Sequence, residues 1–123
     1  MQNKIQVKSV EERENALIFC AENIEIQVEE LKARNHVLVD SDHLSFLYIL
    51  ENESAFIYVS IPHTYWEAMN GAMKSDKAMF VRVNNIEIEL EQLKEEVEYL
   101  IENIEGNANY GEELVTAVEK VFL

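Results

Sequence analysis

Residues 44–61 read LSFLYILENESAFIYVSI and contain the two most apolar stretches of the chain. These stretches, 44–50 and 55–61, flank four polar residues from Glu51 to Ser54. Two apolar runs of this length around a short polar break are typical of an antiparallel β-hairpin. Pro62 ends the second run, because proline has no backbone N–H to donate to a sheet.

Further strands are predicted on both sides of this hairpin, where apolar and polar residues alternate or where both faces are apolar. They cover residues 5–7, 16–21, 24–28, 37–39, 78–83 and 86–90. Residues 16–21 (ALIFCA) are apolar on both faces, which is typical of a central strand. Tight turns are expected at Glu22-Asn23 and at Asn84-Asn85, because asparagine tolerates the positive φ of two-residue hairpin loops.

Helical spacing of apolar residues predicts three helices, near residues 64–74, at 91–105 and from about 109 to the C-terminus. The first and last are expected to begin with a capping box, in which two side chains satisfy free backbone N–H groups at the helix start. The capping pairs are Thr64 with Glu67 and Asn109 with Glu112. Gly106 is expected to end the second helix, because glycine adopts the left-handed conformation that follows many helices.

These elements predict an α+β fold with a largely antiparallel sheet of six to eight strands, one short middle helix and two C-terminal helices packed on the sheet. The 123 residues, 48% of them apolar, suit a single domain spanning 1–123. Strands that are apolar on both faces exceed what three helices on one side would cover. We therefore expect a homodimer, formed through a sheet face or through the aromatic residues of the hairpin, Phe46, Tyr48, Phe56 and Tyr58.

The charge balance is the strongest feature of the composition. Ten lysine and arginine residues face 24 aspartate and glutamate residues, which gives a formal net charge of −14. Affinity for a nucleic-acid backbone comes from cationic side chains that displace counterions, so direct nucleic-acid binding is not expected. An anionic membrane surface would repel the chain for the same reason. The excess carboxylates either serve solubility or meet a basic protein partner.

The cysteine count and the N-terminal residues predict a cytoplasmic protein. Secreted small domains usually carry an even set of cysteines, whereas this chain has only Cys20, which we expect to be buried as a small hydrophobe. Residues 1–8 (MQNKIQVK) lack the basic segment and apolar stretch of a signal peptide. No apolar run approaches the roughly 18 residues that a membrane-spanning helix needs.

Two clusters around histidines are the candidate ligand sites, because histidine titrates near neutral pH. They are Asp40, Asp42 and His43, and His63, Tyr65 and Trp66. The first cluster could bind a divalent ion together with His36, but it lacks a recognised ligand spacing and has the composition of an ordinary turn. In the second, the aromatic residues either flank a small ligand or form a helix entry, with Trp66 in the core and His63 in water.

No catalytic or cofactor motif is present. The three glycines, Gly71, Gly106 and Gly111, do not form a phosphate-binding loop. Ser60 and the other serines lack the Gly-x-Ser-x-Gly pattern of a nucleophile elbow. We therefore predict no catalytic residue, no metal and no cofactor.

The helix expected at 91–105 carries a continuous stripe of glutamates, Glu91, Glu95, Glu98, Glu102 and Glu105, with Glu96 beside it. Like charges four residues apart destabilise a helix by about 0.2–0.5 kcal/mol per pair, so the apolar face has to hold this helix in place. The stripe is either a solvated surface or a docking surface for a basic partner. The docking hypothesis assigns that contact to Glu91, Glu95, Glu98 and Glu102.

Residues 16–32 and 78–94 resemble each other at an offset of 62. The clearest match is Asn23-Ile24-Glu25-Ile26 with Asn85-Ile86-Glu87-Ile88. The similarity fits an old duplication, and it also fits two amphipathic hairpins built independently from glutamate and isoleucine.

At the level of whole segments, residues 3–10 (NKIQVKSV), 45–62 (SFLYILENESAFIYVSIP) and 104–123 (IEGNANYGEELVTAVEKVFL) resemble a family of small acidic proteins from Bacillus and its relatives. The resemblance covers the chain from end to end and implies a bacterial cytosolic protein. That family carries no assigned activity, cofactor or catalytic residue, so it transfers no site to this chain.

Two functional hypotheses follow. The preferred one is a non-enzymatic regulatory or protein-interaction protein whose acidic helix docks a basic partner. The alternative is a small-ligand-binding protein or enzyme built around one of the two histidine clusters. The alternative requires the side chains of a cluster to converge on a concave site.

Overall fold

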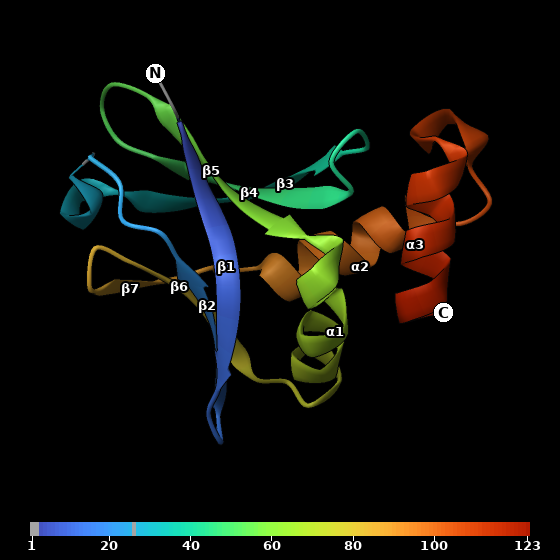
Figure 1. The fold of residues 1–123 in the computed structure, drawn as a ribbon, viewed down its shortest axis with the longest axis horizontal. Helices are drawn as coiled ribbons and strands as arrows, with labels where there is room; N and C mark the ends of the chain where they lie inside the picture. The colour runs from blue at the N-terminus through green and yellow to red at the C-terminus, as the bar shows by residue number, and fades with distance from the viewer. Residues whose placement is uncertain (1–2, 26) are drawn as a thin grey trace.

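The computed structural model describes residues 3–25 and 27–123, and this part of the chain forms a seven-stranded sheet with three α-helices (Figure 1). The strands are β1 (Lys4–Glu12), β2 (Ala16–Ala21), β3 (Lys32–Asp40), β4 (Ser45–Glu51), β5 (Phe56–Pro62), β6 (Ala78–Val83) and β7 (Ile86–Glu89). The helices are α1 (Trp66–Lys74), α2 (Leu93–Ile104) and α3 (Glu112–Phe122). Short 3-10 turns lie at Val28–Glu30, His63–Tyr65 and Ala108–Tyr110. The α+β class is confirmed.

The sheet is mixed, so the prediction of a largely antiparallel sheet is wrong. The described strands follow the order β3-β4-β5-β1-β2-β6-β7, in which β1 runs parallel to β5 and β2 runs parallel to β6. The remaining neighbours are antiparallel hairpins. The N-terminal hairpin β1–β2 is inserted between the other two groups of strands. Hairpins are encoded locally, but the insertion of one hairpin between two others depends on long-range packing.

Local turn chemistry sets the hairpins that the sequence predicted. In β4–β5, Glu51 lies opposite Phe56, and the side chain of Asn52 accepts hydrogen bonds from the backbone N–H groups of the loop. In β6–β7, Val83 lies opposite Ile86. The two residues between them, Asn84 and Asn85, have φ angles of 52° and 65°, as expected for a tight two-residue turn.

The predicted strand at 24–28 is wrong for the residues that can be assigned. Of the described residues 24, 25, 27 and 28, none lies in a strand, and Ile26 lies outside the described residues. Both sides of β2 are already paired, with β1 and β6, so no edge of β2 is left for this segment. The Asn84 side chain instead binds the backbone of Ile24, accepting from its N–H at 2.9 Å and donating to its carbonyl at 2.9 Å.

The repeated segments lie side by side. β2 and β6 are parallel neighbours, and their register from Ala16↔Ala78 to Cys20↔Arg82 reproduces the offset of 62. Beyond these strands the two segments differ, because 86–89 forms β7 whereas its counterpart leads into the 3-10 turn at Val28–Glu30.

The starts of α1 and α3 lack the side-chain caps that the sequence predicted. Within the described chain, the residues before α1 and α3 are Tyr65 and Gly111, and neither supplies a side-chain cap. Both capping-box predictions are therefore wrong. Gly106 follows α2 with a φ of +65°, as predicted for a glycine at a helix end.

The core lies between the inner sheet face and the helices. Phe46, Trp66 and Phe122 pack together in it, with 4.6 Å between the Phe46 and Trp66 ring centroids. Phe46 and Tyr48 are 0% exposed, so two of the four aromatic residues proposed for a dimer contact belong to the core instead. Side chains alternate between the two faces along a strand, so Phe46 and Tyr48, two residues apart in β4, point to the same, inner face. Phe56 is exposed, and Tyr58 is half-buried.

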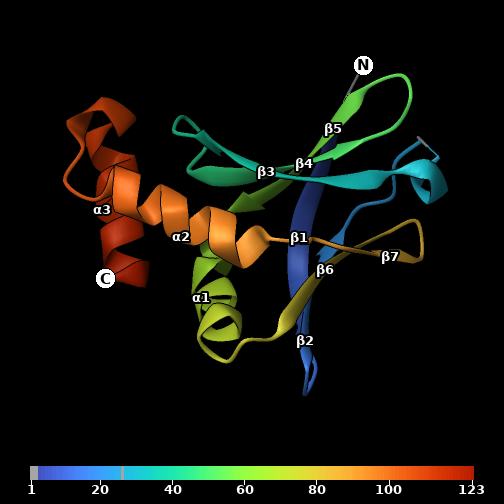
Figure 2. The same ribbon diagram turned by 180° about the vertical axis from the view of Figure 1, so that it is seen from behind.

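All three helices lie on the same side of the molecule in both views (Figures 1 and 2). α2 packs against β3, and α3 packs against α1 and α2. The side chain of Asn70 in α1 donates a hydrogen bond to the carbonyl of Val121 at 3.1 Å, which ties α1 to the end of α3. The sheet curls so that its edge strands β3 and β7 come into contact.

Candidate functional site

The first histidine cluster is a turn at the end of β3. The backbone N–H and ring Nδ1 of His43 contact the Asp40 carboxylate at 3.2 and 2.9 Å. Lys4 Nζ lies 3.7 Å from Oδ2 of the same carboxylate. Burial alone would raise the pKa of Asp40, but the hydrogen bonds from His43 and the charge of Lys4 lower it overall. His36 pairs instead with Glu96 of α2 at 3.4 Å.

Asp42 is exposed beside this turn. Within the described residues, no group of three or more histidine, cysteine, aspartate or glutamate side chains is placed to hold a metal ion. The cluster therefore consists of an Asp40–His43 pair and lacks a converging ligand set.

The second histidine cluster is divided between three environments. Trp66 is fully buried and donates its indole N–H to the carbonyl of Ile61 at 3.0 Å. The hydroxyl of Tyr65 donates to the carbonyl of Lys8 in β1, whereas His63 is exposed. The His63 and Trp66 rings lie edge to face with 6.2 Å between their centroids, whereas the Tyr65 side chain is directed to β1, so the three side chains do not share one site.

His63 does line a groove, although its two predicted partners do not. The groove has a volume of about 600 Å³ and lies between the start of α1 and one side of α3. Its lining residues are Leu44, His63, Thr64, Glu67, Glu112, Glu113, Thr116, Ala117, Lys120 and Val121. No local sequence pattern points to this groove, because its two sides are about fifty residues apart in the chain and meet only through the packing of α1 against α3.

The glutamates of α2 form an exposed surface. Glu95, Glu98 and Glu102 are exposed, and Tyr99 between them is 63% exposed; we call these four residues the α2 acidic face. Leu93, Val97, Ile101 and Ile104 are buried on the opposite side of the helix. Glu91, the fourth predicted docking residue, precedes the helix and is exposed, and its carbonyl accepts a hydrogen bond from Tyr48 at 2.6 Å.

Within the described residues the α2 acidic face has a counter-charge in Lys94, whose pKa is raised first by Asp76 and then by the charges of Glu98 and Glu95. Lys94, the lysine of α2, pairs with Asp76 at 3.2 Å, and no ion pair within the described chain involves Glu95, Glu98 or Glu102. From residue 91 to 123 the sequence carries nine glutamates against two lysines. This end of the chain therefore holds a disproportionate share of the net charge.

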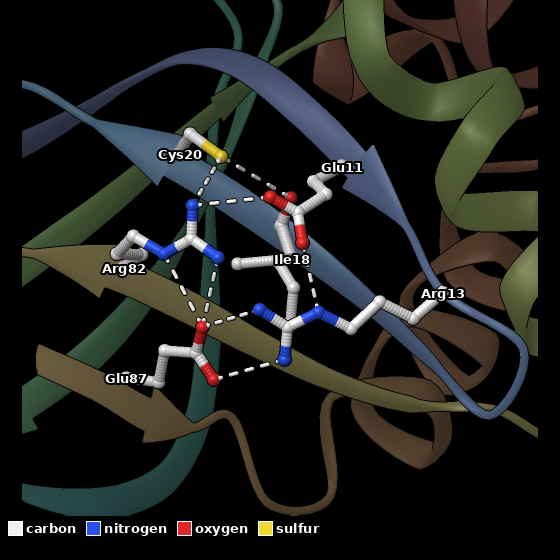
Figure 3. A network of polar contacts seen from close by, with 6 residues as sticks. All are labelled: Glu11, Arg13, Ile18, Cys20, Arg82 and Glu87. Carbon is white, nitrogen blue, oxygen red and sulfur yellow. Dashed lines mark hydrogen bonds and ion pairs between the residues drawn. The ribbon is translucent and has the colours of Figure 1, made fainter.

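A second charged region, on the outer face of the sheet, is internally paired (Figure 3). Arg13 binds both carboxylate oxygens of Glu87 at 3.2 and 2.8 Å and also Glu11 at 2.8 Å. Arg82 binds Glu87 at 2.9 Å and Glu11 at 3.2 Å. We call these four residues the outer network.

The outer network covers part of the apolar sheet face. Ile18 lies among its side chains (Figure 3) and is 0% exposed, although it is not part of the main core. Cys20 is half-buried, with its Sγ atom 3.9 Å from Arg82 Nη1, so it is less buried than the small core hydrophobe that was predicted. Hydrogen bonds from Arg13 and then Arg82 hold the pKa of Glu11 and of Glu87 below the ordinary value.

One half of this network could have been read from the sequence. The two-residue turn Asn84-Asn85 places Arg82 directly opposite Glu87 on the same face. The contribution of Glu11 and Arg13 depends on where the β1–β2 hairpin is inserted, for which no local pattern gives a signal.

No helix in residues 3–25 and 27–123 is long and apolar enough to cross a membrane. Comparison with solved structures finds none that matches. The family model described as "Family of unknown function (UPF0738)" matches residues 5–122. UPF0738 proteins of Bacillus cytotoxicus, Bacillus mycoides and Bacillus cereus are each 85% identical to this chain over 123 residues, which is 100% of both sequences. The resemblance to an uncharacterised Bacillus family is confirmed, and the chain belongs to the UPF0738 family.

Proposed function

We propose that this protein is a non-enzymatic, cytoplasmic interaction protein that docks a basic segment of a partner protein on the α2 acidic face. The observation that carries the proposal is the exposed set Glu95, Glu98 and Glu102 around the exposed Tyr99, with no ion-pair partner for these glutamates among the described residues. Aromatic residues are enriched in protein interfaces, and complementary charge speeds encounter and sets orientation.

Helix stability does not account for this arrangement. Glu98 and Glu102 are four residues apart and repel each other. Glu102 also lies in the last turn of α2, where the negative end of the helix dipole disfavours a carboxylate. The buried residues on the other side of α2 hold the helix despite these costs. Glu95 lies in the first turn of α2, where a carboxylate is favourable, so the cost falls on Glu98 and Glu102, and an external cation would offset it.

The test is capture of partners from a lysate of the source bacterium, with quantitative mass spectrometry. The variant Glu95→Lys/Glu98→Lys/Glu102→Lys is compared with Glu12→Lys/Glu14→Lys/Glu53→Lys, which reverses three exposed glutamates elsewhere and has the same net charge. We expect the α2 variant to lose a specific partner that the wild type and the control retain, and added salt to weaken this capture. Equal loss from both variants, or from neither, would reject the α2 acidic face as the docking surface.

The homodimer expected from the sequence also stays a proposal. Ile18 is covered by the outer network, which reduces the apolar surface that motivated it. Leu38 and Phe56, 39% and 44% exposed, are the large apolar residues of β3 and β5 that remain for such a contact. Sedimentation of the wild type against Leu38→Lys tests it, and a wild-type monomer at micromolar concentration would reject it.

A further inference from the structure

The groove between α1 and α3 is lined by both apolar and acidic residues. Leu44, Ala117 and Val121 are the apolar residues of its lining. All three are half-buried. A volume of about 600 Å³ lies within the range of sites that hold small molecules or one or two side chains of a partner.

The charged residues that line the groove are predominantly negative. Glu67 lies in the first turn of α1, and Glu112 and Glu113 lie in the first turn of α3. Carboxylates at these positions are favourable for their own helices. Only the packing of α1 against α3 makes them converge on one groove. Among the residues that the structure describes, none of the three has an ion-pair partner, and Lys120 is the one lysine in the lining.

We propose that this groove receives a short segment of the basic partner in which a lysine or arginine neighbours an aliphatic residue. The aliphatic side chain would cover Ala117 and Val121, and the cation would lie between the carboxylates of Glu67 and Glu113. This inference rests on the proposed function and identifies the chemistry of the partner segment. The α2 acidic face offers carboxylates around the single exposed ring of Tyr99, whereas the groove places several aliphatic residues beside its carboxylates and so selects for a cation next to an aliphatic group.

A peptide titration separates these two contributions. The probes are two short acetylated and amidated peptides, one alternating lysine with leucine and the other alternating lysine with serine, so that their charges are equal. Trp66 is the single tryptophan of the chain. Its ring lies 6.2 Å from that of His63, and His63 lines the groove. Its emission therefore reports occupation of the groove, and anisotropy of a labelled peptide reports binding anywhere on the protein.

The leucine peptide is expected to bind about tenfold tighter than the serine peptide, because it buries an apolar side chain, and to change Trp66 emission. Ala117→Trp fills the groove and is expected to abolish this preference while leaving the weaker, charge-driven binding. Thr116→Trp, at an exposed position of the lining, provides a second filled variant if Ala117→Trp does not fold. Equal affinities for the two peptides, or a preference that survives both filled variants, would overturn the inference.

Failure of the groove can be told apart from failure of the proposed function. Equal binding of both peptides that is lost in Glu95→Lys/Glu98→Lys/Glu102→Lys rejects the groove and retains the α2 acidic face. A leucine preference that this triple variant leaves intact supports the groove and moves the docking site away from α2. The other possible occupant is a second copy of this chain, which sedimentation tests. A dimer that Ala117→Trp dissociates would assign the groove to that second copy and overturn the inference.

Discussion

The outer network and the α2 acidic face handle charge in opposite ways. On the outer sheet face, Glu11 and Glu87 share two arginines, and each carboxylate has two cationic partners (Figure 3). On α2, three glutamates are exposed, with no ion-pair partner in the described chain. Both surfaces belong to the same chain, which has 24 acidic residues and only ten basic ones.

The difference shows where the few cations are used. Arg13 and Arg82 connect strands that are far apart in the sequence and cover the buried Ile18. The two arginines thereby balance the charges of Glu11 and Glu87 on this sheet surface. The helical side keeps Glu95, Glu98 and Glu102 without ion-pair partners in the described chain, although Glu98 and Glu102 repel each other, which is the pattern of a surface available for a partner. Three measurements test this contrast, in order of decreasing effect on stability.

The largest effect is expected when the apolar anchor of α2 is removed. Ile104 is 0% exposed, so Ile104→Ala should destabilise the protein by about 2–5 kcal/mol through lost burial and a residual cavity. Tyr99→Ala on the exposed side of the same helix should change stability little. Urea unfolding of both variants provides the measurement. A similar loss from the two variants would show that the exposed side of α2 also contributes to the fold.

An intermediate effect is expected on acidification of the outer network. The pKa values of Glu11 and Glu87 are lowered below the ordinary 4.5 in the folded state, so their contribution to stability is fully present above that value. It is lost as the pH falls below 4.5 through the lower folded values. Glu11→Gln/Glu87→Gln should therefore flatten the loss of stability in this range, as measured by the unfolding midpoint against pH.

The matched control for this titration is Glu12→Gln/Glu14→Gln, which changes two neighbouring exposed glutamates that form no ion pair among the described residues. The control should keep the wild-type slope below pH 4.5. Equal slopes in all three proteins would mean that the arginine contacts are screened by solvent and do not stabilise the fold.

The smallest effect is expected on α2 itself, and its sign is informative. Glu102→Gln removes repulsion from Glu98 and an unfavourable charge near the helix end, so stability should rise by about 0.2–0.5 kcal/mol. The same substitution should weaken capture of the basic partner. A gain in stability together with a loss of binding identifies a surface kept for function at a cost to the helix. Loss of stability in urea unfolding would instead give Glu102 a structural role.

Local sequence patterns predicted the elements well where the interacting residues are neighbours in the chain. The β4–β5 hairpin, the Asn84-Asn85 turn and the glycine after α2 all follow from short-range chemistry. The predictions failed where an element competes for a place in the sheet, as in the segment at 24–28. Closeness in sequence also did not make Tyr65 and Trp66 face the same site, because their side chains bind the backbone of different strands.

The sequence by itself determined the strong negative charge, the exposed glutamate stripe of α2 and the family to which the chain belongs. These properties depend on composition, helical periodicity and residue identity, which are local. Only the tertiary structure decided that β1–β2 is inserted between β5 and β6, that Arg13 reaches Glu87, and that α1 and α3 enclose an acidic groove. Each of these depends on residues distant in the chain, and their pairing is selected by burial of the whole core.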